Sequence, residues 1–144
     1  AYGCATWNGL RLPAGGAGHI SLFDLASTAR EIAGDRHHFS IVQLPINLSM
    51  SEGMRVSTQR DPRGRLVHVT QAAAELGIDL VASAPLMQGQ LTQALPAQVR
   101  EAFPGSTDAQ KALAFVHGVP GVVTAAVGMK SRSHMDENLG AFRA

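Results

Sequence analysis

Four short apolar segments, each followed by a helix-like pattern, constrain the fold of this chain more than any other feature. The segments begin near residues 2, 41, 78 and 122, so one unit takes about 40 residues, the size of a strand, a helix and their loops. They are almost entirely apolar and lack two-residue alternation, which is typical of parallel strands covered on both faces. The sequence therefore predicts an α/β fold of four parallel βα units joined by right-handed crossovers.

The expected elements alternate along the chain. Strands are predicted over 1–6, 41–44, 78–82 and 122–127, and helices over 21–33, 65–76, 96–102, 107–118 and from Ser133 onward. The polar stretch 49–64 is expected to be a loop. The residues expected to face inward are Leu22, Leu25, Ala26, Ala29, Ile32 and Ala33 in the first helix, and Met135, Leu139 and Phe142 in the last.

Two architectures fit four such units. One is a small doubly wound, flavodoxin-like sheet with strand order 2-1-3-4 and a flavin or phosphoryl site. The other is half of an eight-stranded barrel, which needs about 250 residues for all eight units. The chain has 144 residues and starts at Ala1 inside an apparent strand, so we expect a single partial domain, 1–144, cut from a longer polypeptide.

The composition excludes several classes of protein. Apolar residues make up 45% and charged residues 16%, which is too apolar for a disordered chain. A net charge of +1 does not indicate a nucleic-acid or membrane partner, and we expect neither. A single cysteine, Cys4, excludes an internal disulfide, and His37-His38 has no evident third metal ligand, so no metal site is expected. The absence of a signal segment favours a cytoplasmic location.

Four segments resemble the aldo-keto reductase family. Residues 3–8 resemble its G-V-S-N-W segment, 42–47 its sixth strand, 77–91 its seventh strand with A-Y-S-P-L-x-x-G-x-L, and 119–139 its eighth strand and nucleotide-binding tail. The segments occur in the family's order and at its spacing. The resemblance implies the C-terminal half of a TIM (β/α)8 barrel, strands five to eight.

The resemblance also implies that NADP(H) binds at the carboxyl ends of these strands. In the family, matching positions hold the nicotinamide amide (Thr6, Gln43). Lys130 and nearby Arg132 add positive charge that suits a 2′-phosphate, so NADP(H) is expected rather than NAD(H). Ala5 and Ser83 depart from the family, which has a serine at the first position and often an aromatic ring at the second. The full set of implied cofactor-binding residues is Thr6, Gln43, Ser83, Leu86, Gln88, Gly89, Gly128, Met129, Lys130, Ser131, His134, Glu137 and Asn138.

Catalytic residues are not expected in this chain. The family carries its catalytic Asp, Tyr, Lys and His on the first four strands, which the resemblance does not cover. The only tyrosine is Tyr2 and the only lysines are Lys111 and Lys130, so no constellation makes a phenol into a general acid. We expect the parent protein to reduce an aldehyde or ketone by hydride transfer, with the N-terminal half of the barrel as the partner of this chain, which alone is inactive.

Two further expectations remain open at this stage. The alternative function is a non-catalytic nucleotide-binding or scaffold (β/α)4 module, such as a regulatory subunit of the same superfamily. The edges of a half barrel should make the isolated chain aggregate, dimerise to close the barrel, or occur only with its other half. Trp7 either lines the substrate pocket or fills the core, and the core is the default expectation for a lone aromatic residue.

Overall fold

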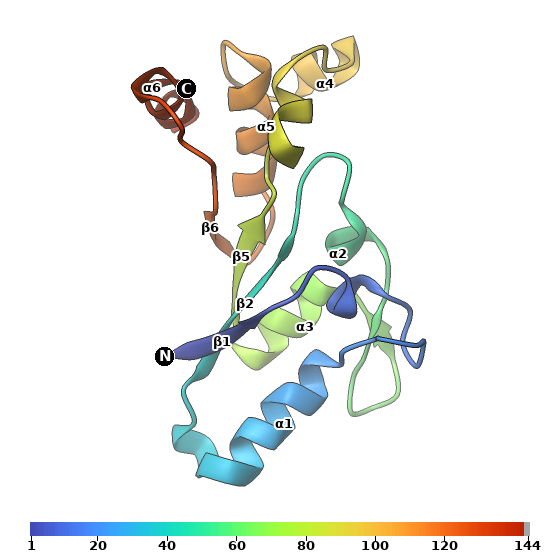
Figure 1. Ribbon diagram of the computed structural model, residues 1–144. Helices are drawn as coiled ribbons and strands as arrows, with labels where there is room; N and C mark the ends of the chain where they lie inside the picture. The colour runs from blue at the N-terminus through green and yellow to red at the C-terminus, as the bar shows by residue number, and fades with distance from the viewer. Residues whose placement is uncertain (143–144) are drawn as a thin grey trace.

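The computed structural model describes residues 1–142, which form a four-stranded parallel sheet and an antiparallel hairpin (Figure 1). The strands of the main sheet are β1 (Tyr2–Ala5), β2 (Phe39–Pro45), β5 (Asp79–Ser83) and β6 (Val122–Ala125), and β3 (Gln59–Arg60) pairs with β4 (Leu66–Val67). The α-helices are α1 (Leu22–Ala33), α2 (Glu52–Arg55), α3 (Val69–Leu76), α4 (Ala97–Ala102), α5 (Asp108–His117) and α6 (Arg132–Gly140). Short 3-10 turns occupy η1 (Gly9–Arg11), η2 (Gly34–Arg36) and η3 (Met87–Thr92).

The order of strands in the main sheet is β1-β2-β5-β6, the same as their order along the chain. All three neighbouring pairs are parallel. This confirms the prediction of four parallel βα units. It also contradicts the flavodoxin-like alternative, which required the second strand of the chain to lie outside the first.

The helices pack against one face of the sheet. On this face β2 contributes the fully buried Val42 and Leu44, and β5 contributes Leu80 and Ala82. The buried side chains of the covering helices are Leu22, Ala26 and Ala29 in α1, Val69, Ala72 and Ala73 in α3, and Ala109, Ala112, Leu113 and Val116 in α5. The main core therefore lies between the sheet and its helices, and Ala112 belongs to a smaller cluster with Leu91 and Leu95. The sheet face that points away from the main core has no helix across it among the described residues.

The helix ends follow local sequence signals. The Ser21 hydroxyl accepts a hydrogen bond from the Asp24 N–H at 3.1 Å, and the Thr107 hydroxyl accepts one from the Gln110 N–H at 3.3 Å, so each side chain caps the helix that follows it. Helix α3 ends at Gly77, whose φ of 66° lies in the left-handed region that favours glycine. These caps fix where α1 and α5 begin and where α3 stops.

The segment 49–68 differs from the expected loop and early helix. It contains α2 and the β3–β4 hairpin, and helix α3 begins at Val69 instead of at 65. The Asp61 carboxylate explains the hairpin, because it accepts hydrogen bonds from the N–H groups of Arg63 and Arg65 at 2.9 and 2.8 Å. The side chain of Asp61 thereby closes the turn between the two short strands.

Two predicted apolar stripes are partly wrong. Ile32 on α1 is 81% exposed. Met135 and Leu139 on α6 and Phe142 just after it, all expected to face inward, are exposed, while Asn138 is buried. Helix α6 is capped by Ser131, two residues earlier than expected, and β6 ends at Ala125, before Val127. Terminal apolar residues do not need burial when a short helix is held through polar contacts, as α6 is.

Within residues 1–142 no helix combines the length and the apolar character needed to cross a bilayer. In the same part of the chain, no three His, Cys, Asp or Glu side chains come together as metal ligands would.

Candidate nucleotide-binding site

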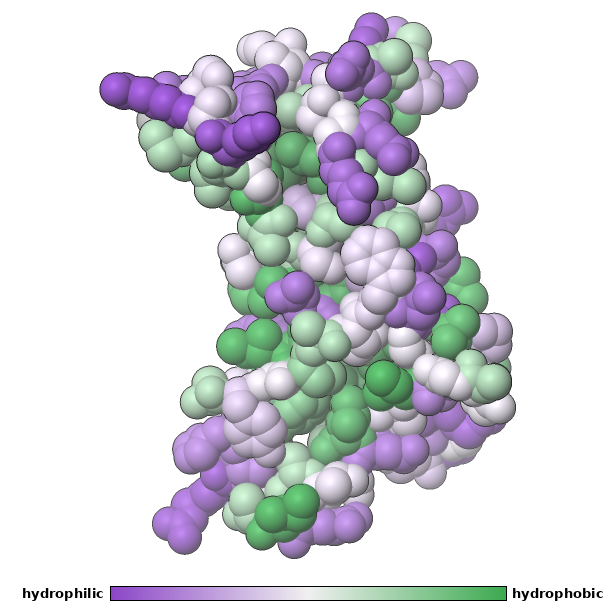
Figure 2. Space-filling view, in the orientation of Figure 1, coloured by the Kyte–Doolittle hydropathy of each residue, from purple (hydrophilic) through white to green (hydrophobic). Residues whose placement is uncertain are grey.

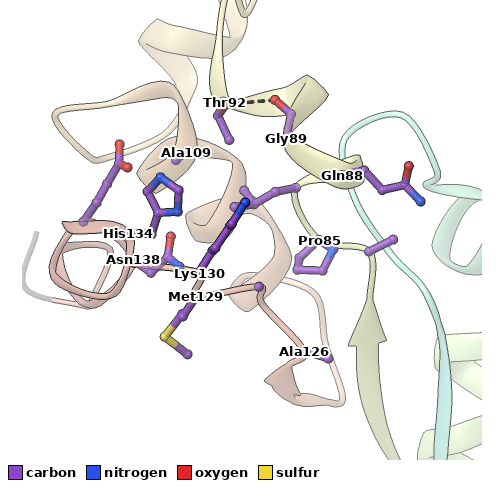
Figure 3. Close-up of a pocket in the computed structure, with 14 residues that line it drawn as sticks. Pro85, Gln88, Gly89, Thr92, Ala109, Ala126, Met129, Lys130, His134 and Asn138 are labelled. Atoms are coloured by element: carbon purple, nitrogen blue, oxygen red, sulfur yellow. Dashed lines mark hydrogen bonds between the residues drawn. The ribbon is translucent and has the colours of Figure 1, made fainter. Parts of the chain in front are cut away.

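A cavity of about 690 Å³ lies between the segments that follow β5 and β6 (Figure 3). Its volume falls within the range of small-molecule and cofactor sites. Three parts of the chain line it: the loop after β5, helix α5, and the segment from the end of β6 into α6. The lining residues are Ala84, Pro85, Leu86, Gln88, Gly89, Thr92, Ala109, Ala126, Gly128, Met129, Lys130, His134, Glu137 and Asn138.

The wall that follows β5 is a tightly turned backbone. Ala84, Met87 and Gln88 have positive φ values of 48°, 48° and 56° although none is glycine, and Gly89 follows with φ 88°. Such conformations cost free energy and are held only where the surrounding structure fixes them. Here the Thr92 hydroxyl donates to the Gly89 carbonyl at 2.8 Å, which closes the turn against the cavity.

The opposite wall is the junction of β6 and α6. The Ser131 hydroxyl accepts a hydrogen bond from the His134 N–H at 3.2 Å, so α6 begins beside the cavity. The first turn of a helix has free N–H groups and the positive end of the helix dipole. Figure 3 shows the Lys130 side chain extending from this junction toward the segment after β5, with the His134 ring on the same side. This wall therefore offers an ammonium group, from Lys130, and free backbone N–H groups to a ligand.

Asn138 is the most informative residue of the cavity. Only 6% of it is exposed, and its Nδ2 atom has no hydrogen-bond partner within the described chain. Leaving a buried amide donor unpaired costs about 1–3 kcal/mol. A ligand with an acceptor atom at this position would recover that free energy.

Helix α6 is held in place by one glutamine of α5. Gln110 donates through Nε2 to the Glu137 carbonyl at 3.0 Å and accepts the Ser106 N–H through Oε1 at 2.7 Å. Its amide also lies so close to Gly140 that a Cβ there would collide with it. Because α6 carries His134, Glu137 and Asn138, Gln110 fixes one wall of the cavity.

The loop between β5 and α5 is fixed by a second polar contact. Asp108 accepts two hydrogen bonds from the Arg100 guanidinium, both at 2.8 Å, and one from the Leu95 N–H at 3.0 Å. The pKa of the Asp108 carboxyl lies below its ordinary value, mainly because of the Arg100 guanidinium and to a smaller extent because of the Leu95 N–H. The same contact raises the pKa of Arg100. This ion pair ties α4 to the start of α5 and so limits the movement of the loop.

Nine of the thirteen sequence-predicted residues line the cavity, and four do not. Ser131 caps α6 beside it. Gln43 and Ser83 lie on β2 and β5, near the carboxyl ends of these strands, on the sheet face that no helix covers. Thr6 directly follows β1, and its Oγ1 is buried without a partner in the described chain. The structure thus groups the residues into a cavity beside α6 and a separate row along the strand ends.

Sequence reasoning missed some residues and misplaced one. Thr92 and Ala109 line the cavity, but nothing in a threonine within a long loop or an alanine in a helix indicates such a role. Trp7 is 53% exposed, so the expectation that it fills the core is wrong. Arg11 holds this segment, because its guanidinium donates to the Trp7 carbonyl at 3.1 Å and pairs with Glu52 at 3.0 Å.

Comparisons with known proteins find similarity in structure alone. No family profile and no curated protein sequence matches the chain. The fold is similar to a thermostable aldo-keto reductase in complex with the inhibitor epalrestat, with a TM-score of 0.53 and 18% identity over 78% of this chain and 38% of that one. It is equally similar to the holo and apo forms of an aldo-keto reductase from Bacillus halodurans, with a TM-score of 0.53 and 18% identity over 85% of this chain and 42% of that one.

The chain therefore spans about two fifths of the length of the solved structures it matches. Their likeness shows the fold class predicted from the sequence, an α/β half of a TIM (β/α)8 barrel with four parallel βα units. In such barrels ligands lie at the carboxyl ends of the strands. The cavity follows the carboxyl ends of β5 and β6, which is the end where this architecture places its sites.

Proposed function

We propose that this chain is the NADP(H)-binding half of an aldo-keto reductase that reduces aldehydes or ketones. The observation that carries the proposal is the unpartnered, buried amide of Asn138 in one cavity with Lys130 and His134. A nucleotide offers acceptor atoms on its base to the Asn138 amide and negatively charged phosphates to Lys130. The fold likeness to aldo-keto reductases supports the same class of ligand.

The residues of the cavity fit the adenosine end of the cofactor. The Asn138 amide would donate to the adenine base, beside Glu137, and Lys130 would attract the 2′-phosphate together with the N–H groups at the start of α6. Gln88 and Gly89 would lie along the pyrophosphate, where the turned backbone comes close to the cavity. Because an uncompensated 2′-phosphate needs a cation, Lys130 favours NADP(H) over NAD(H).

The row along the strand ends fits the nicotinamide end. Thr6 offers a buried hydroxyl without a partner, and Gln43 offers an amide on the neighbouring strand. Both groups suit the carboxamide of a nicotinamide ring. Ser83 provides no aromatic ring to stack on it, so the ring is held by its carboxamide. When bound, NADPH supplies the hydride that passes to a carbonyl carbon.

The proton for the carbonyl oxygen must come from outside this chain. Tyr2, the only tyrosine, stands at the first residue of β1, the end opposite to the candidate site. Lys111 donates to the carbonyls of Arg100 and Phe103 and is therefore occupied. We infer that the N-terminal half of the barrel supplies the proton donor and the rest of the carbonyl site, and that this chain alone does not reduce carbonyl compounds.

The position of Tyr2 also favours a second candidate function. A half barrel that binds a nucleotide but has no proton donor beside it is what a non-catalytic regulatory or scaffold module of the same superfamily would look like. The residues of the N-terminal half of the barrel distinguish the two candidate functions. Only the enzyme requires a tyrosine, a lysine, an aspartate and a histidine there.

Calorimetric titration of the chain with NADPH and with NADH tests the cofactor part of the proposal. Lys130→Ala removes the cation of the cavity, and we expect the dissociation constant for NADPH to rise about tenfold, equivalent to about 1.4 kcal/mol. The constant for NADH should change less than threefold, because NADH lacks the phosphate that Lys130 attracts.

Arg132→Ala is the matched control for this titration. Arg132 is two residues away with the same charge, but its side chain is 90% exposed, it lies outside the cavity and its nearest acidic partner is Asp136 at 3.8 Å. NADPH affinity should therefore stay within about threefold of the unmodified chain. Equal losses in both variants, or no binding of NADPH at all, would contradict the proposed site.

A further inference from the structure

Asn47 connects the segment that follows β2 to the cavity wall that follows β5. It lies two residues beyond the end of β2, and none of it is exposed. Its Nδ2 atom donates to the Ala84 carbonyl at 2.9 Å, and Ala84 is the first residue after β5. A fully buried amide therefore reaches from the carboxyl end of one central strand to the carboxyl end of the next.

The oxygen of the same amide closes a turn. Oδ1 of Asn47 accepts the N–H groups of Ser49 and Met50 at 2.9 and 2.8 Å. The backbones of Asn47 and Met50 also exchange two hydrogen bonds, at 3.2 and 3.1 Å. Asparagine side chains commonly bond backbone groups a few residues further along the chain in this way. The turn fixes the side chain, so its Nδ2 atom has a fixed direction toward Ala84.

Ala84 has a backbone conformation that alanine rarely adopts. Its φ of 48° lies in the left-handed region, although Pro85 follows and favours an extended conformation at this position. Such a conformation persists only where neighbouring contacts fix it. The Ala84 carbonyl accepts the Met87 N–H and Nδ2 of Asn47, both at 2.9 Å. Met87 belongs to the turned segment itself, so Asn47 supplies the contact from outside it.

The cavity wall formed by residues 84–92 is held from the side of β2. Between described residues, no hydrogen bond joins this segment to α6 across the cavity. In Figure 2 the hydrophilic side chains near α6, at the upper left, are separated by apolar surface from those on the right. On the β2 side, Leu48 packs against the same apolar cluster as Leu86 and Met87. Asn47 adds a directed polar contact to this apolar one, which fixes the orientation of the Ala84 peptide.

We propose that Asn47 is a positioning residue that holds the cavity wall after β5 in its ligand-binding conformation. Asn47 does not line the cavity, so it acts through the Ala84 carbonyl. Ala84 begins the wall and directly follows Ser83, the last residue of β5. A ligand binds more tightly when it does not have to order its own site. The inference rests on the proposed function for the identity of the ligand, NADPH.

Calorimetric titration of Asn47→Ser with NADPH tests the effect on affinity. The serine hydroxyl can still accept the Ser49 N–H and keep the local turn, but it is too short to reach the Ala84 carbonyl. We expect the dissociation constant for NADPH to rise about tenfold at a temperature where circular dichroism shows the variant folded. Adding Ala84→Gly to this variant should bring the constant back to within about threefold of the unmodified chain, because glycine adopts a positive φ without an outside contact.

Gln59→Leu is the matched control for this titration. It also removes a buried amide that bonds backbone groups, but Gln59 neither lines the cavity nor contacts its walls through a hydrogen bond. Its loss should lower stability and leave the NADPH affinity of the folded chain within about threefold. Equal losses of affinity in Asn47→Ser and Gln59→Leu would overturn the proposal, and so would a failure of Ala84→Gly to restore binding.

Hydrogen exchange followed by NMR tests the positioning role without NADPH. In the unmodified chain the Asn47 side-chain amide should exchange at least about tenfold more slowly than that of Gln98, which is exposed. In Asn47→Ser the Met87 N–H should exchange faster, while the Ala73 N–H in α3 should not. Rapid exchange of the Asn47 amide in the unmodified chain would overturn the proposal even if Asn47→Ser does not fold. Faster exchange at Met87 in a chain that binds no NADPH would support the positioning role and contradict only the proposed function.

Discussion

Two regions beside the carboxyl ends of the strands differ in whether their buried polar side chains are fully hydrogen-bonded. One region joins the segment after β1 to the segment after β2, and its buried amide, Gln59, is fully bonded. The other lies after β5 and β6, and its buried amide, Asn138, has a donor without a partner. The same chemical group is thus a structural element in one place and an open site in the other.

The Gln59 side chain connects three backbone segments. Its Oε1 accepts the Leu22 N–H at 2.7 Å, at the start of α1, and its Nε2 donates to the Leu10 carbonyl at 2.9 Å and the Ile20 carbonyl at 3.3 Å. Thr58 adds a hydroxyl donor to Leu10 at 2.7 Å. A fully satisfied buried network of this kind stabilises one arrangement of the chain.

The difference distinguishes a structural polar cluster from a ligand site. Satisfied groups gain no hydrogen bond from a ligand, whereas the Asn138 amide has a donor without a partner in the described chain and can bond an acceptor atom of a ligand. The three buried side-chain atoms without partners in the described chain belong to Thr6, His37 and Asn138, and two of them lie where the cofactor is proposed. Variants of the two amides test whether this distinction holds.

Gln59→Leu should have the largest effect. The leucine keeps the volume but leaves the Leu22 N–H and the Ile20 carbonyl without their side-chain partner inside the protein. We expect the free energy of unfolding to fall by about 3 kcal/mol. Urea denaturation measures it, as a lower midpoint at an unchanged slope.

The control for this variant is Gln98→Leu on α4, where the glutamine is exposed. Its unfolding free energy should change by less than about 0.5 kcal/mol. If both glutamine variants lose the same stability, the Gln59 network does not join the two segments in the way the hydrogen bonds indicate.

Asn138→Leu should show the reverse behaviour. Removing an unpaired donor relieves its burial cost, so the unfolding free energy should stay within about 1 kcal/mol of the unmodified chain. NADPH affinity should fall about tenfold, because a hydrogen bond to the base is lost. Denaturation and calorimetry on the same preparation measure both quantities. A stability loss as large as that of Gln59→Leu would show that Asn138 is structural.

The sequence predicted the parts of the fold whose signals are local. Strand β5 and helix α5 follow from a continuous apolar run and from a threonine cap, and the structure contains both close to the predicted bounds. The β3–β4 hairpin was not predictable in this way, because it depends on the hydrogen bonds of Asp61 in a stretch with no apolar period. Its polar composition is typical of a loop.

The candidate site could also be predicted only in part from the sequence. A motif can indicate which residues belong to a strand end or a helix start, and nine of these line one cavity. It cannot show that Asn138 points inward on α6 while Leu139 does not, because that depends on Gln110 holding the helix from α5. The apolar period of α6 predicts the opposite orientation. The local hydrogen bonds of Asp61 decided the first difference and the long-range contact of Gln110 decided the second, and neither leaves an apolar pattern in the sequence.

The smallest expected effect concerns how stability changes with pH in the region that contains Gln59 and Asp61. Burial opposes ionisation of Asp61, but the Arg65 N–H, the Arg65 guanidinium and the Arg63 N–H together outweigh it and hold the pKa of the carboxyl below its ordinary value. The unfolded chain therefore takes up the proton first as the pH falls. The stabilisation is complete above the pKa of the unfolded chain, about 4, and is lost as the pH falls through the lower pKa of the folded state.

Asp61→Asn should weaken this acid dependence without abolishing it. Asp108, whose pKa is lowered by Arg100 and Leu95, contributes a loss of the same sign from the other region. Urea midpoints measured between pH 3 and pH 7 should therefore fall less steeply below about pH 4 in Asp61→Asn than in the unmodified chain. Asp108→Asn should flatten the same range and, because Asp108 fixes the loop beside the cavity, should also lower NADPH affinity at pH 7, which Asp61→Asn should not. Identical effects of the two variants on NADPH affinity would mean that the two regions are energetically coupled. The difference between the bonded amide of Gln59 and the unpaired amide of Asn138 would then not distinguish a structural cluster from a ligand site.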